Sequence, residues 1–236
     1  GDDGGGSAGG GAGGGRSGPG KSLRIVDAGC GRGYLTFASH AYFDQLGWDV
    51  KTAGVEIRKD LVTSMNGVAR GLGAGFDGLV FEHAQVSEYL AALGGMDPSG
   101  PDGGELTSSS RVDVLVALHA CDTATDDALW CGISNGARVI VTAPCCHKQV
   151  RRQLEVDESR PRGPLDAALR HGIYRERTAE MVTDTLRSLL LEIGGYDVSV
   201  FEFVGGEHTA KNVMIAAVKR KHLRSDAELA ERRAEF

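Results

Sequence analysis

The sequence predicts an α/β fold in which a mostly parallel sheet carries helices on both faces. Short apolar segments typical of buried strands alternate with longer segments whose apolar residues recur at helical spacing. Glycines crowd the loop directly after the first of these strands. The 236 residues are enough for one mid-sized domain with a substantial core. We therefore expect one α/β domain rather than two.

Each element is predicted from its own pattern. The expected strands are residues 22–27, 49–55, 79–83, 112–118, 137–143, 197–204 and 212–218. The expected helices are residues 34–46, 59–71, 125–132 and 179–193. Because no helix separates the last two strands, we expect them to form an antiparallel pair at the edge of the sheet. Together these elements predict a Rossmann-like, seven-stranded, mostly parallel sheet.

Low-complexity segments set the expected domain limits. Residues 1–20 are almost all glycine and other small residues, which predicts a disordered Gly/Ser-rich tail. The domain is expected over residues 21–222, with a surface insertion at 94–110 and a charged tail at 223–236. Since the first residue is not methionine, we expect an upstream segment in the full protein. The cytoplasm is the expected location, with an organelle as the alternative.

The composition argues against three classes of protein. No apolar run approaches the roughly 18 residues of a membrane span, so no membrane partner is expected. Five cysteines, two of them adjacent, suit reduced thiols better than a disulfide framework. The net charge of −6 argues against an indiscriminate nucleic-acid binder. The pattern predicts no particular oligomeric state.

The glycine loop predicts a nucleoside-binding site. Gly29, Gly31 and Gly33 occupy alternate positions directly after the first strand, where they allow backbone to press against a ligand. Glu56 ends the second strand, 23 residues after Gly33, and an acid at this place can bind both hydroxyls of a ribose. Two separate features thus agree on a nucleoside.

The spacing of this loop favours S-adenosylmethionine over a dinucleotide. Dinucleotide sites usually read G-x-G-x-x-G, which leaves room for a pyrophosphate at the helix start. Here G-x-G-x-G follows Asp27, which can engage the ammonium of an amino-acid end or, alternatively, only cap the turn. Gln85 is a candidate for the adenine edge, although it could equally be an exposed loop residue. Further cofactor contacts are expected from Tyr34, Ile57 and Leu118.

Histidines and thiols follow the fourth and fifth expected strands, residues 112–118 and 137–143. We expect them to gather on the side of the site that holds the methyl acceptor. The candidates are His119, Cys121, Asp122, Cys145, Cys146 and His147. They suit acid/base catalysis, covalent catalysis by a cysteine, or zinc binding. Zinc ranks last and no metal is expected, because adjacent cysteines rarely share one tetrahedral ion. Alternatively, the cysteines pack under the cofactor and the histidines make ordinary hydrogen bonds.

Four strings carry a resemblance to a known family. They are D-A-G-C-G-R-G-Y-L, H-A-C-D-T-A-T-D, A-P-C-C-H-K and E-H-T-A-K-N, spread over residues 23–219. The chain resembles a methyltransferase-domain family that includes the tRNA position-4 ribose 2′-O-methyltransferases and the glutathione S-transferase C-terminal-domain-containing protein. The resemblance implies RNA, tRNA among them, as the substrate.

Charge is unevenly distributed along the chain. Residues 1–147 hold 10 Lys/Arg against 17 Asp/Glu, whereas residues 148–236 hold 16 against 15. The segment 148–177 is rich in arginine and could be either a solvated face or a rim that contacts RNA phosphates. We therefore expect methyl transfer from S-adenosylmethionine to RNA. The alternatives are a small-molecule or protein methyltransferase and a non-catalytic subunit of an assembly.

Overall fold

The computed structural model describes residues 22–94, 111–118, 120–155, 163–221 and 225–235. The predicted tail at 1–20, nearly all of the predicted insertion at 94–110 and the candidate residue His119 lie outside these ranges.

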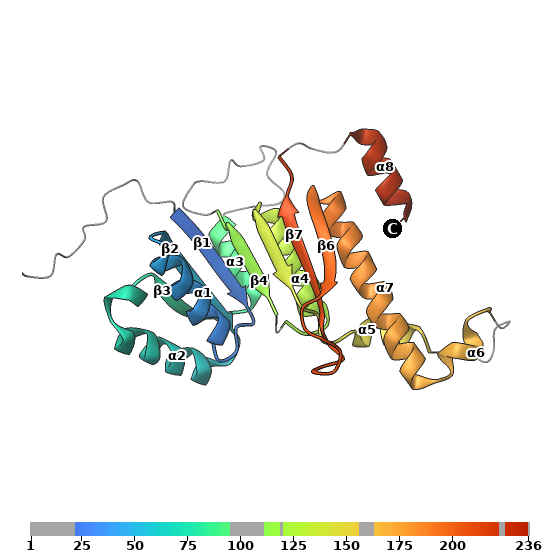
Figure 1. The fold of residues 1–236 in the computed structure, drawn as a ribbon, viewed down its shortest axis with the longest axis horizontal. Coiled ribbons are helices and arrows are strands. Elements are labelled where there is room, and N and C mark those ends of the chain that lie inside the picture. The colour runs from blue at the N-terminus through green and yellow to red at the C-terminus, as the bar shows by residue number, and fades with distance from the viewer. Residues whose placement is uncertain (1–21, 95–110, 119, 156–162, 222–224, 236) are drawn as a thin grey trace, which may run out of the picture.

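The fold is built on a seven-stranded sheet with the order β3-β2-β1-β4-β5-β7-β6 (Figure 1). The strands are β1 (Ser22–Ala28), β2 (Asp49–Glu56), β3 (Leu79–His83), β4 (Val114–Ala117), β5 (Val139–Thr142), β6 (Tyr196–Glu202) and β7 (Val213–Lys219). The pairs among β1 to β5 are parallel, whereas β7 runs antiparallel to both β5 and β6. This arrangement confirms the predicted Rossmann-like sheet with an antiparallel edge pair.

The strand order places a reversal point in the middle of the sheet. β1 pairs with β2 on one side and with β4 on the other, so the chain moves outward from β1 first in one direction and then in the other. Loops that leave the carboxyl ends of β1 and β4 therefore diverge and open a crevice, which is where ligands bind in sheets of this kind.

The helices agree with the sequence pattern only in part. Those that connect strands are α1 (Tyr34–Gln45), α2 (Lys59–Leu72), η1 (Ala74–Phe76), α3 (Val86–Gly94), α4 (Thr123–Ser134), α5 (Lys148–Gln153), α6 (Asp166–Leu169) and α7 (Gly172–Ile193), and α8 (Asp226–Glu235) follows the sheet. The expectation for α7 was wrong at its start, which lies at Gly172 rather than residue 179. Its first turns are rich in charged residues, so they lack the apolar spacing that marks a helix. The helices α3, α5, α6 and α8 were not predicted.

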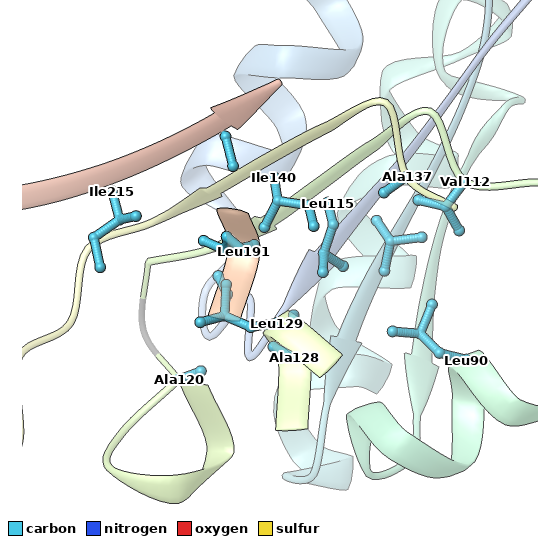
Figure 2. Packing of buried hydrophobic residues seen from close by; sticks show 14 of the residues in the cluster. Leu90, Val112, Leu115, Ala120, Ala128, Leu129, Ala137, Ile140, Leu191 and Ile215 are labelled. Atoms are coloured by element: carbon cyan, nitrogen blue, oxygen red, sulfur yellow. The ribbon is translucent and has the colours of Figure 1, made fainter. Parts of the chain in front are cut away.

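The larger core lies between the sheet and the helices α3, α4 and α7 (Figure 2). Leu115 and Ile140 from the central strands meet Leu129 of α4 and Leu191 of α7, and all four side chains are buried. Alternation along β4 and β5 sends these residues to one face. This packing fixes the loops that leave β4 and β5.

A second core covers the opposite face of the β1–β3 half of the sheet. Val62 and Ala69 of α2 pack with Leu79 and Phe81 of β3, and Phe37 of α1 lies against them. Helices therefore cover both faces, as predicted. No helix in the described ranges combines the length and apolar character needed to cross a membrane.

Candidate active site

The glycine loop after β1 has a backbone that other residues adopt only with strain. Gly29, Gly31 and Gly33 all have positive φ, of 71°, 58° and 70°. The backbone N–H groups of Gly29 and Cys30 both donate to the carbonyl of Val55, at 2.9 and 3.1 Å. The loop is thereby tied to β2, and the alternate glycines serve the turn as the sequence indicated.

Gly33 is also required by its surroundings. A Cβ atom there would come within 2.6 Å of the Phe81 ring. Nearby, the Thr36 hydroxyl donates to the buried carboxylate of Asp27 at 2.6 Å. Asp27 therefore joins β1 to α1 as well as lining the cavity described below. Its predicted contact with the cofactor ammonium stays a prediction.

Glu56 lies at the end of β2 with both carboxylate oxygens engaged. The N–H groups of Gly31 and Arg58 each donate to it at 3.0 Å. The Arg58 guanidinium adds hydrogen bonds of 3.0 and 3.1 Å, one to each oxygen. These bonds from Arg58 lower the pKa of Glu56 below its usual value, so the acid is ionised at neutral pH. Arg58 was not singled out from the sequence, although its position two residues after Glu56 was visible.

A cavity of about 720 Å³ opens at the reversal point between β1 and β4. This size lies in the usual range for cofactor sites. The predicted cofactor residues in its wall are Asp27, Gly29, Gly31, Tyr34, Glu56, Ile57, Gln85 and Leu118. The remaining predicted residue, Gly33, is the N-cap residue of α1 and is not part of this wall. Wall residues that the sequence did not reveal include Cys30, Arg58, Val86, Ala124 and Asp127.

Three of the predicted acceptor-side thiols come together at the edge of this cavity. Cys121 lies in the cavity wall, and its Sγ is 3.4 Å from the Sγ of Cys145. Cys145 Sγ is in turn 3.6 Å from Cys146 Sγ. Burial, followed by the two neighbouring thiols, raises the pKa of Cys145 to about 12. We call Cys121, Cys145 and Cys146 the thiol cluster.

Asp122 has an unusual backbone that its neighbours hold in place. Its φ of 57° lies in the region that residues other than glycine rarely adopt. The N–H of Gln149 donates to its carboxylate at 3.3 Å, and Arg187 Nη2 donates to its carbonyl at 2.9 Å. Strained residues of this kind concentrate at functional sites. The structure thus links the turn after β4 to both α5 and α7.

His147 lies behind the acceptor side rather than in the cavity wall. It is 3% exposed, and its Nε2 is 3.0 Å from the carboxylate of Asp184 on α7. Arg187 bonds the same carboxylate at 3.1 Å and that of Asp126 at 2.7 Å. His147 therefore holds the loop after β5 against α7, a role closer to the ordinary hydrogen bond that we considered than to proton transfer.

The arginine-rich segment begins where the thiol cluster ends. Lys148 is the first residue of α5, directly after the loop that carries Cys145 and Cys146. Arg151 pairs with Glu176 at 2.9 Å, which joins α5 to the start of α7. Exposed side chains in the described parts of this segment include Lys148, Arg152, Arg170, Tyr174 and Arg177. In Figure 1, α5, α6 and the first turns of α7 lie at the end of the sheet where β5 finishes.

The class of this protein is defined by four features in order along the chain. They are a strand, a loop whose glycines have positive φ, a helix, and an acid at the end of the next strand. It is a Rossmann-like, S-adenosylmethionine-dependent methyltransferase domain, and its cofactor is S-adenosylmethionine. A family model described as a methyltransferase domain matches residues 16–153, more than half of the chain. The chain belongs to this methyltransferase-domain family.

Several solved structures are similar to this chain at low sequence identity. The CMeT domain of the citrinin polyketide synthase has a TM-score of 0.48 and 12% identity over 86% of this chain and 48% of its own. Magnesium protoporphyrin IX methyltransferase from Synechocystis PCC 6803, with bound SAH, has a TM-score of 0.45 and 14% identity over 85% and 75%. Geranyl diphosphate methyltransferase has a TM-score of 0.47 and 15% identity over 86% and 74%.

The chain spans about half the length of the first of these structures. No curated protein matches the sequence directly.

Proposed function

We propose that this protein transfers the methyl group of S-adenosylmethionine to an RNA. The observation that carries the proposal is the position of α5, the start of the arginine-rich segment, which directly follows the loop that carries Cys145 and Cys146. Lys148 and Arg152 on α5 are exposed, as are Arg170 and Arg177 further along. Exposed cations in the segment that follows the acceptor-side loop suit a substrate with a phosphate backbone.

An exposed aromatic residue within this segment supports the same substrate. Tyr174 is 55% exposed, and the ring of His171 meets it edge to face at 5.8 Å. Rings of this kind stack on unpaired bases, while neighbouring arginines hold the backbone. Single-stranded or loop RNA therefore fits better than a regular duplex.

The cavity residues would divide the work of methyl transfer. The glycine loop and Asp27 hold the amino-acid end of the cofactor, and Glu56 accepts the ribose hydroxyls. When bound, S-adenosylmethionine would supply its sulfonium methyl to the acceptor atom as the bond from sulfur to that methyl breaks, and the acceptor proton would pass to a base. Asp127 lies in the cavity wall on this side, and Asp122 lies in the turn after β4, so either carboxylate is a candidate for this base. Positioning of the two reactants contributes to the catalysis of such a step.

Cofactor binding is tested by isothermal titration with S-adenosylmethionine. The isosteric double variant Asp27→Asn/Glu56→Gln keeps the shape of the site but removes both charges. We expect affinity to fall about 100-fold or more, because two charge-assisted hydrogen bonds are lost. No binding by the wild-type chain, or equal binding by the variant, would overturn the assignment of these two residues.

The substrate is tested with methyl-tritiated cofactor in a cell extract from which small RNAs and proteins are then separated. We expect label in RNA, and at least a tenfold loss of it in the variant Lys148→Glu/Arg152→Glu/Arg170→Glu, whose remaining activity should depend less steeply on salt than that of the wild type. The matched control, Lys51→Glu/Arg70→Glu/Arg111→Glu, makes the same charge change at exposed positions outside segment 148–177 and should leave labelling intact. Label in protein alone, or in neither fraction despite cofactor binding, would contradict RNA as the substrate.

A further inference from the structure

We propose that the thiol cluster of Cys121, Cys145 and Cys146 is a zinc site with one coordination position left open. The three sulfur atoms all lie within 4.8 Å of one another. They come from two different loops, one after β4 and one after β5, and the closest pair joins the loops at 3.4 Å. Nothing in the cofactor chemistry requires three thiols at this place.

The distances fit a single tetrahedral ion. With bonds of about 2.3 Å from zinc to sulfur, two ligands of a tetrahedral site lie roughly 3.8 Å apart. The sulfur of Cys145 lies 3.4 Å from one neighbour and 3.6 Å from the other. Shifts of a few tenths of an ångström would therefore admit the ion. The sequence spacing of Cys145 and Cys146 argued against shared ligation, but the structure brings their sulfurs to the required separation.

The ligand set selects the type of ion. Among the described residues the group consists of three thiols, without a carboxylate or an imidazole. Thiolates favour zinc and other soft ions over magnesium or calcium. On binding, each thiol gives its proton to solvent and each sulfur bonds to the metal, with no change of oxidation state. A disulfide would use only two of the three sulfurs.

The position of the cluster suggests what the ion would do. Cys121 lies in the wall of the cofactor cavity, so the ion would lie at its acceptor edge. Three protein ligands and one open position are typical of zinc sites that bind water or a substrate atom. The ion would also tie the loop after β4 to the loop after β5. The inference rests on the cluster alone and does not require RNA as the substrate.

Zinc binding is measured on the full chain, reduced and freed of metal with a chelator. Titration with zinc sulfate against a chromophoric competitor should give one equivalent per chain, and zinc should raise the melting temperature. Cobalt in place of zinc should give an intense sulfur-to-metal absorption band. The variants Cys121→Ser, Cys145→Ser and Cys146→Ser should each lose affinity at least about tenfold, the loss that even outer-shell changes produce. The control Cys131→Ser, on α4 and outside the cluster, should keep it.

Several results would overturn the site. One is a chain that retains no zinc although all its thiols react with a thiol reagent. Another is a cobalt spectrum without sulfur-to-metal bands. A third is an equal affinity for zinc in all four cysteine variants. A disulfide between Cys121 and Cys145 in a chain that takes up no zinc after reduction would show a redox pair instead. Titration with S-adenosylmethionine in parallel separates the two proposals. A chain that binds the cofactor but not zinc contradicts only the metal site, and the reverse contradicts only the cofactor assignment.

Discussion

The two sides of the cavity are held in place by different means. On the cofactor side, backbone groups dominate: loop amides bond the carbonyl of Val55, and alternate glycines take positive φ. On the acceptor side, charged side chains dominate, with Arg187 bonding Asp126, Asp184 and the backbone of Asp122. Backbone contacts constrain which ligand fits, whereas side-chain contacts can change without altering the fold. We infer that cofactor identity is built into the chain path and that the acceptor is selected by side chains.

The largest effect is expected from removing Arg187, which tests whether charged side chains hold the acceptor side in place. Its side chain is 2% exposed and holds two carboxylates, one of them nearly buried. The substitution Arg187→Met should lower the free energy of unfolding by about 3–5 kcal/mol, because the nearly buried carboxylate of Asp184 loses the guanidinium beside it. Urea denaturation measures the change. Arg138→Met, which removes a 64% exposed arginine 3.9 Å from Asp113, should stay within about 0.5 kcal/mol. Similar losses in both variants would contradict a special role for Arg187.

Backbone control of the cofactor side is tested by two glycines with matching φ. Gly33 and Gly47 have φ of 70° and 79°, but only at Gly33 would a Cβ meet another side chain, the Phe81 ring. Gly47→Ala should cost about 1–2 kcal/mol from its φ alone. Gly33→Ala should cost about 1–3 kcal/mol more through overpacking and should weaken cofactor binding. Thermal unfolding measures the loss of stability, and titration calorimetry measures cofactor binding. Equal losses of stability in the two variants would show that the Phe81 ring moves aside without an energetic cost.

Acid sensitivity of the cofactor side should come partly from His40. Its Nε2 is 3.2 Å from the carbonyl of Gly75 and its Nδ1 is 3.0 Å from the Thr52 hydroxyl, so the neutral ring donates to the first and accepts from the second. Burial lowers the pKa of His40 below 6.5. The unfolded chain therefore takes up the proton first, and stability falls as the pH drops below about 6.5, until the folded pKa is reached.

For one proton, the free energy of unfolding can fall by up to about 1.4 kcal/mol for each pH unit in this range. The variant His40→Gln keeps a donor and an acceptor but does not titrate. Urea midpoints at about pH 7.5 and pH 5.5 should differ less in this variant than in the wild type. An unchanged difference would place the acid sensitivity elsewhere.

The smallest expected effect concerns Arg58. The Arg58 guanidinium occupies lone pairs of the Glu56 carboxylate that the two ribose hydroxyls would need. The hydrogen bonds from the two backbone N–H groups leave enough lone pairs for both hydroxyls. Cofactor binding must therefore displace this side chain. Arg58→Ala should tighten S-adenosylmethionine binding about two- to fivefold, a small effect because the Arg58 side chain is largely exposed to solvent. Calorimetry tests this, with Arg70→Ala on α2 as the control. Weaker binding would show that Arg58 contacts the cofactor directly.

The two sides also differ in how far the sequence could predict them. The glycine loop, Glu56 and the cavity contacts at Gln85 and Leu118 were predicted because they lie at strand ends, which apolar runs locate well. The convergence of Cys121 with Cys145 also followed from neighbouring strands. By contrast, Asp184 and Arg187 lie within α7, whose pattern gives no sign that they face inward to Asp126 and His147. Contacts of this kind depend on how a helix docks, and no local spacing encodes that.

Arg187 also fixes the order in which the domain can become complete during synthesis. The carbonyl of Asp122 and the carboxylate of Asp126 lie more than 60 residues earlier in the chain, so a growing polypeptide has made both long before their partner emerges. The glycine loop, by contrast, has Val55 within 30 residues. A nascent chain would thus hold a finished cofactor loop while the turn at Asp122 waits for α7, and amide hydrogen exchange in the mature protein should show that turn opening together with α7.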